Sequence, residues 1–188
     1  MKGSHQQSSV LSALSKEELI PQASIDDICA DYAGKSKPFI RFLVEDKNIN
    51  GKDIATILAA NFGYPHIQLT NFDTTLVPEG VRNEKLITKH NALPLFLRGK
   101  VLFVAMSDPT NLEALEEIQF NTGYTTELVL AEENTLHACI ERVLEEDSDA
   151  LDISDIDSEE LADIDVQDER QDDEPAPGAE KDDAPIVV

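Results

Sequence analysis

A stretch of helical pattern near the start of the chain is followed by a second copy of itself at an offset of 29 residues. The matched positions are Leu14 and Leu43, Ile20 and Ile49, Ile25 and Ile54, Ile28 and Ile57, Ala30 and Ala59, and Gly34 and Gly63. Because the glycine of each copy stands where a helix would end in a left-handed turn, the repeat predicts a helix pair that packs on its duplicate. The alternative is a chance likeness between amphipathic helices, which the matched glycines disfavour.

Helix-capping residues predict where the helices of this region begin. Each of these side chains precedes an apolar helical pattern, and the first opens a capping box with Glu18: Ser15, Ser24, Ser36 and Asn50. Pro38 falls in the first turn of the third helix, where proline is tolerated. The helix that follows Asn50 is expected to cover residues 51–62.

The pattern changes after Pro65. Strands are predicted over residues 93–97 and Val101–Met106, which a turn at Arg98 and Gly99 connects, and over residues 125–130. Helices are predicted over residues 81–90, from Asp108 and Pro109 to Gly123, and over residues 132–144. Helices that alternate with a few short strands are typical of a small layered α/β structure.

The predicted fold class is therefore α+β. A helical subdomain of duplicated helix pairs is expected at residues 10–66, and a small α/β subdomain of about three strands at residues 67–145. Residues 1–9 are expected to be disordered or a tag. Residues 185–188 turn apolar, which is the pattern expected of the start of a truncated next domain.

The acidic residues of the chain are concentrated near its end. The chain carries 38 acidic and 15 basic residues, a formal charge of −23, and residues 145–184 hold 19 of the acids against Arg170 and Lys181, a net charge of −17. Because a segment of this composition cannot bury enough apolar surface to fold, a disordered acidic linker is expected at residues 146–184. A segment that folds on a partner is the alternative, because apolar residues alternate with the acids.

Charge and hydropathy exclude several classes of function. No window of the chain concentrates lysine and arginine, so nucleic-acid binding is not expected. The longest apolar run, Val101–Met106, is far shorter than the roughly 20 residues that span a bilayer, so no direct membrane insertion is expected. Cys29 and Cys139 lie at apolar-periodic positions and are expected to be reduced residues in or near the core of a cytoplasmic protein.

Motifs that carry chemistry are incomplete. Cys29–Ser36 matches the phosphate-binding pattern G-x-x-x-x-G-K-[ST] except that cysteine replaces its first glycine, and we interpret it as the end of a helix. Asp155 resembles the start of a calcium-binding loop, but Glu160 occupies the position that requires glycine. His66, His90 and His137 have no metal-ligand spacing. We therefore expect no catalytic residues, no metal site and no cofactor, and do not interpret this chain as an enzyme.

Three segments together resemble the N-terminal domain of the secretion and type IV pilus extension ATPases, an MshEN-like family. They are Leu93–Phe96 with Leu102–Met106, then Ser107–Asn111, then Ile118–Gly123, and the helical end Phe62–Leu69 is also similar. The resemblance covers roughly residues 10–145 and the last five residues, Ala184–Val188. It implies that an ATPase lies C-terminal to this fragment, and that the fragment is a regulatory and docking region in the cytoplasm, peripheral to the inner membrane through the pilus machine.

Relatives in this family bind cyclic di-GMP through duplicated R-L-G-x-x-L-x-x-x-G motifs. In the register of the repeat, the arginine is replaced by Ser9 and Pro38, the first glycine by Leu11 and Ile40, and the later glycine by Glu18 and Lys47. Arginine pairs with the nucleotide and glycine lets the backbone approach it, so these replacements remove the binding chemistry. We expect no nucleotide-binding residues; the alternative is a cyclic di-GMP sensor domain with a non-standard motif.

The resemblance then implies protein partners. These are the PilZ adaptor, which links to a cyclic di-GMP receptor protein, and the inner-membrane platform protein of the pilus machine. The residues expected to anchor a partner are the apolar side chains Leu11, Leu14, Leu19, Ile20, Phe39, Phe42 and Leu43. The alternative for each of them is a place in the helical core.

Overall fold

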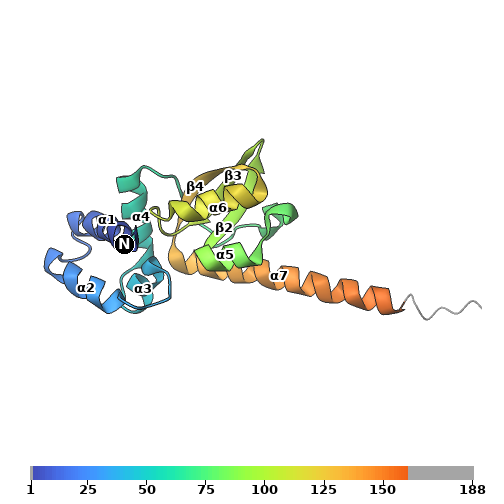
Figure 1. Ribbon diagram of the computed structural model, residues 1–188, viewed down its shortest axis with the longest axis horizontal. Helices are drawn as coiled ribbons and strands as arrows, with labels where there is room; N and C mark the ends of the chain where they lie inside the picture. The colour runs from blue at the N-terminus through green and yellow to red at the C-terminus, as the bar shows by residue number, and fades with distance from the viewer. Residues whose placement is uncertain (1, 161–188) are drawn as a thin grey trace, which may run out of the picture. The chain divides into compact units, whose positions relative to one another are not determined.

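The structure is a computed structural model that describes residues 2–160, with side chains described for residues 7–146. The chain divides into two compact units, Met1–Ala150 and Leu151–Val188, and all the strands of the fold belong to the first. The predicted linker beyond residue 160 and the predicted domain start at residues 185–188 lie outside the described residues. The fold class is α+β, as predicted (Figure 1).

The helical part consists of α1 (Lys2–Lys16), α2 (Ile25–Tyr32), α3 (Phe39–Glu45) and α4 (Gly51–Phe62), with a 3-10 turn at Gln22–Ser24. Residues 2–9, which were expected to be disordered or a tag, are helical. One face of α1 is held in the core by Val10, Leu11 and Leu14, and the polar residues before them extend the same helix.

Helix boundaries follow the predicted caps only in part. Asn50 caps α4 by accepting hydrogen bonds from the amides of Lys52 and Asp53 at 2.9 and 3.2 Å. The capping box predicted at Ser15 is wrong, because Ser15 lies in the last turn of α1. Ser24 precedes α2 without bonding it, and α3 begins after Pro38 instead of Ser36. A fixed φ near −65° makes proline suitable at such a start.

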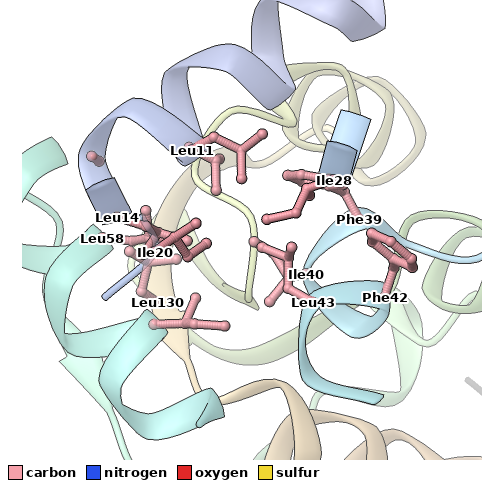
Figure 2. Packing of buried hydrophobic residues seen from close by; sticks show 13 residues of the cluster. Leu11, Leu14, Ile20, Ile28, Phe39, Ile40, Phe42, Leu43, Leu58 and Leu130 are labelled. Carbon is pink, nitrogen blue, oxygen red and sulfur yellow. The ribbon is translucent and has the colours of Figure 1, made fainter. Parts of the chain in front are cut away.

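The duplication predicted from the sequence agrees with the packing. Both helix pairs contribute to one buried cluster (Figure 2), and each matched leucine or isoleucine either belongs to this cluster or packs against it. Gly34 and Gly63, the last matched pair, both have left-handed backbones, with φ of +82° and +74°. A leucine of β4, Leu130, closes this cluster from the side of the α/β part, so the helical core is continuous with the sheet.

The α/β part contains a four-stranded sheet in the order β1-β4-β3-β2. Its strands are β1 (His66–Ile67), β2 (Ala92–Arg98), β3 (Val101–Met106) and β4 (Thr125–Ala131). β2 pairs with β3 in antiparallel fashion, whereas β4 is parallel to both β3 and β1. The sequence predicted about three strands, because β1 is two residues long and too short to show a period of two.

Helices cover both faces of this sheet. The helices are α5 (Glu84–His90), α6 (Leu112–Thr122) and α7 (Glu133–Glu160), and short 3-10 turns lie at Thr74–Leu76 and Glu79–Val81. α6 packs on the face that carries Val104, and α7 packs on the face that carries Ala105 (Figure 1). The helix predicted over residues 81–90 begins only at Glu84, because Asn83 is its cap.

α7 is longer than predicted. The sequence predicted that it would end at residue 144 and that a disordered linker would begin at residue 146, but the helix continues to Glu160. No glycine or proline occurs between Gly123 and Pro175, so no residue with a strong helix-breaking preference stops it. Within the described residues, no helix is long and apolar enough to span a membrane.

Candidate functional site

A groove on the surface of the helical part is the feature best suited to contact a partner. It encloses a volume of about 570 Å³ between the loop after α1, one face of α2 and the loop after α3. Its lining mixes six apolar residues with four polar or charged ones and comprises Leu19, Ile20, Pro21, Ser24, Asp27, Ile28, Ala30, Asp31, Lys47 and Ile49. We call this the α2 groove.

The loops after α1 and α3 form two walls of the α2 groove. Each loop contains a residue with a left-handed backbone, Glu18 at φ +59° and Asn48 at φ +54°. The amide that follows it, of Leu19 or Ile49, donates a hydrogen bond back to the carbonyl of Leu14 or Leu43, at 3.0 and 3.1 Å. The two turns span five and six residues, and each loop contributes an aliphatic side chain to the groove.

Charged residues lie at the rim of the α2 groove. Lys47 donates a hydrogen bond to Asp31, and this contact lowers the pKa of the Asp31 carboxyl below its ordinary value. Asp31 is exposed, so the pair adds little to stability. A polar rim around a more apolar centre is the usual composition of a protein interface.

The structure places most of the predicted anchors inside the protein. Leu11, Leu14, Ile20, Phe39, Phe42 and Leu43 are at most 6% exposed and belong to the helical core (Figure 2). This is the alternative that the sequence left open for each of them. Leu19 is half-buried, and it lines the α2 groove together with the edge of Ile20. Ile49 was missed as a surface residue, although the repeat matches it to Ile20.

A polar cluster joins the helical part to the α/β part. Arg41 Nε on α3 donates to Glu133 Oε1 on α7 at 2.8 Å, and Arg41 Nη2 donates to Asn91 Oδ1 at 2.9 Å. Asn91 Nδ2 in turn donates to both carboxylate oxygens of Glu133, at 3.1 and 3.0 Å. Glu133 is 2% exposed, so this carboxylate is one of the few buried charges among the described residues and is held by both parts.

Residues considered for other chemistry occupy structural positions. Cys29 lies in the last turns of α2, so the stretch that resembles a phosphate-binding loop is a helix end, as interpreted from the sequence. Cys29 is half-buried, Cys139 is buried, and both are free thiols. Among the described residues, no three histidine, cysteine, aspartate or glutamate side chains are grouped closely enough to hold a metal ion.

Comparison with known proteins defines the class of this domain. Residues 62–150 match the model of the MshEN domain family. Two solved structures share the fold: MshE with cdg (cyclic di-GMP), with a TM-score of 0.55 and 23% identity over 71% of this chain and 97% of the other, and the N-terminal domain of XpsE, with 0.60 and 16% over 73% and 94%. At these identities the two structures establish the fold alone.

Curated relatives define the family more narrowly. The type IV pilus assembly ATPase PilB of Pseudomonas aeruginosa is 34% identical over 148 residues, which are 79% of this chain and 26% of that protein. PilB of Acinetobacter baylyi is 37% identical over 71% of this chain and 23% of its own length, and PilB of Myxococcus xanthus is 36% identical over 77% and 25%. The chain thus spans about a quarter of these relatives, and it belongs to the N-terminal domains of type IV pilus assembly ATPases.

Proposed function

We propose that this chain is a non-catalytic regulatory and docking domain of a type IV pilus extension ATPase, and that it binds a PilZ-type adaptor protein through the α2 groove. The observation that carries the proposal is the groove itself. It is the place where one of the predicted anchors, Leu19, is accessible, and it lies on the part of the chain in which the repeat has lost the nucleotide-binding residues.

The composition of the α2 groove supports a protein ligand. Leu19, Pro21 and Ile49 offer aliphatic surface that a partner side chain would cover, which favours binding by removing that surface from water. Asp27, Asp31 and Lys47 surround it with charges of both signs, which orient a partner more than they attract it. Such a groove suits a few apolar anchors from a partner.

The proposed role places this domain between a signal and a motor. The full-length parent would be an ATPase, as its relatives are named, and the adaptor would link this domain to a cyclic di-GMP receptor protein. The inner-membrane platform protein is a second proposed partner, which would keep the domain in the cytoplasm beside the inner membrane. The fragment itself would bind no cofactor.

Calorimetric titration of this chain with the purified PilZ adaptor of the same organism tests the proposal. Leu19→Asp should weaken binding by about tenfold or more, because it places a charge on the aliphatic surface of the groove. Lys47→Glu should also weaken binding by about tenfold or more, because it reverses a charge at the rim. Leu112→Asp is the matched control, since Leu112 is exposed on α6. If PilZ does not bind, or if Leu112→Asp weakens binding as much as Leu19→Asp with circular dichroism unchanged, the α2 groove is not the docking site.

Binding of cyclic di-GMP is the second candidate function. It is favoured by the fold shared with MshE, whose structure was solved with cdg. Against it, the positions expected to be glycine carry Leu11 and Ile40, which are at most 2% exposed and occupy space in the core. Titration of this chain with cyclic di-GMP separates the candidates, because a Kd of about 1 μM or tighter would support the sensor.

A further inference from the structure

The carboxyl ends of β3 and β4 form a crevice of the kind that binds ligands in α/β proteins. The two strands are parallel neighbours, and the helices that follow them pack on opposite faces of the sheet, α6 after β3 and α7 after β4. Loops that diverge in this way leave an opening between the strand ends, where ligands bind. Here the helical part fills the opening above β4. Leu130 of β4 packs into the core of the helical part, and Glu133 at the start of α7 accepts a hydrogen bond from Arg41 of α3.

A cavity remains at the end of β3. It has a volume of about 350 Å³ and lies between the loop that joins α2 to α3 and the segment Ser107–Asn111 that joins β3 to α6. Ligand sites for small molecules have volumes from about 300 Å³ upward, so this cavity is large enough for one sugar or nucleoside. We call it the β3 cleft.

Ser107 lines the β3 cleft beside Asp108 and Asn111. The residue is 4% exposed, and among the described residues no buried side-chain nitrogen or oxygen atom lacks a hydrogen-bond partner. A serine hydroxyl can both donate and accept a hydrogen bond. Ser107 therefore brings one group of this kind to the wall of the cleft.

Asp108 and Asn111 each bring a further hydrogen-bonding atom to the cleft. Asp108 Oδ1 accepts from the amide and the hydroxyl of Thr110, at 2.9 and 2.6 Å, while Oδ2 takes no hydrogen bond from the described residues. Asn111 Oδ1 caps α6 by accepting from the amide of Ala114 at 3.3 Å, which leaves its Nδ2 to donate. Burial raises the pKa of the Asp108 carboxyl, so a hydrogen-bond donor beside Oδ2 would relieve its desolvation.

An aromatic side chain, that of Tyr32, also lines the β3 cleft. The Tyr32 hydroxyl donates to the carbonyl of Lys37 at 2.8 Å, and its ring meets that of Phe39 edge to face with centroids 4.9 Å apart. Lys37 and Lys89 also line the cleft, and Lys37 is paired with Glu45 and Asp46, and Lys89 with Glu117. The cations near the cleft are thus already neutralised, and the carboxylate within it disfavours a simple anion.

These groups match the chemistry of a vicinal diol. A carboxylate oxygen accepts from one hydroxyl, a serine and an amide N–H bind the other, and an aromatic ring covers the apolar face of the sugar. We propose that the β3 cleft binds a small molecule with a vicinal diol, either the ribose of a nucleoside or a free monosaccharide. Asp108 accepts from the diol, and Ser107 and Asn111 complete its hydrogen bonds.

Titration of this chain by ¹H–¹⁵N NMR tests the proposal with three probes: adenosine, 2′-deoxyadenosine and ribose. A diol should shift the amide signals of Ser107, Asp108, Thr110 and Asn111 saturably at millimolar concentration or below, and loss of the 2′-hydroxyl should weaken binding about tenfold. Binding of adenosine but not ribose identifies a nucleoside as the source, and comparable binding of both identifies a free sugar. If neither binds below about 5 mM, or if 2′-deoxyadenosine binds as well as adenosine, the proposal is wrong.

Substitutions of residues that line the β3 cleft test whether the diol binds there. Ser107→Ala and Asp108→Asn should each weaken binding of the diol about tenfold or more, while thermal unfolding checks that the chain remains folded. Asn121→Ala is the matched control, because Asn121 lines a separate cavity beside residues 80–85. Undiminished binding to a folded Ser107→Ala variant would overturn the assignment, even if Asp108→Asn failed to fold.

Discussion

Arg41 on α3 and Glu133 on α7 form an ion pair with Nε and Oε1 2.8 Å apart, although 92 residues separate them in the sequence. Glu133 is almost fully buried, and the Arg41 side chain is 18% exposed. The pair therefore connects the helical part to the first turn of the helix that leads out of the domain. Removing one partner would leave the other charge in a site with little water.

Arg41→Met should destabilise the domain by about 3 kcal/mol, because the Glu133 carboxylate would keep only its bonds to Asn91. Urea unfolding followed by circular dichroism measures the change. Lys37→Met removes exposed ion pairs with Glu45 and Asp46, and it should cost much less stability than Arg41→Met. Equal effects of the two substitutions would contradict the structural role of the buried pair.

Leu14→Ala should cost about 2–5 kcal/mol, because Leu14 is fully buried and a cavity would remain in the helical core. Leu112→Ala is the control, since Leu112 is 51% exposed, and its effect should stay within about 0.5 kcal/mol. Thermal unfolding of the two variants compares them directly. If Leu14→Ala cost no more stability than Leu112→Ala, Leu14 would be an exposed anchor and not a core residue.

Gly63→Ala should destabilise the domain by about 1 kcal/mol. Gly63 ends α4 at φ +74°, and no atom within 4 Å would obstruct a Cβ, so the cost arises from the backbone conformation alone. Gly80→Ala tests this reasoning, because Gly80 has equally open surroundings without a positive φ. That substitution should leave stability unchanged or raise it by up to about 1 kcal/mol; a comparable loss at both glycines would show that crowding is responsible.

The free energy of unfolding of the Asp108→Asn variant, relative to that of the unaltered chain, should increase as the pH rises. Burial raises the pKa of the Asp108 carboxyl above the ordinary value of 3.8, so the folded state loses stability as the pH rises from that value through the raised pKa and the carboxyl ionises. Asparagine keeps the acceptor for Thr110 and does not ionise. Unfolding free energies of the variant and the unaltered chain between pH 3 and 8 measure the difference.

Asp73→Asn gives the opposite sign and serves as the control for the pH series. Hydrogen bonds from Thr75 lower the pKa of the Asp73 carboxyl, so its stabilising contribution is present above the ordinary value of 3.8 and is lost as the pH falls through the lowered pKa. The disadvantage of Asp73→Asn should therefore be greatest near neutral pH. Parallel pH profiles for the two variants would contradict the burial of Asp108.

Local sequence patterns were sufficient for several elements. α4 begins after Asn50 and ends before Gly63, and the apolar run Val101–Met106 forms β3 with the same bounds. A cap, a left-handed glycine and a short apolar run each act over a few neighbouring residues, so the sequence alone reveals them. The resemblance to pilus and secretion ATPases was also visible in contiguous segments. The same reasoning failed at Ser15, where a capping pattern occurs at the end of a helix already held in the core by Leu11 and Leu14.

The sequence by itself thus determined the α+β class, the repeat and the family. Only the tertiary structure decided which apolar residues of the repeat are core and which, like Leu19 and Ile49, line a groove, because both kinds share one helical periodicity. It also decided that Ser107 and Asp108 border a cleft and that Arg41 meets Glu133. Those relationships depend on how separate elements pack, and no spacing along the chain encodes such long-range contacts.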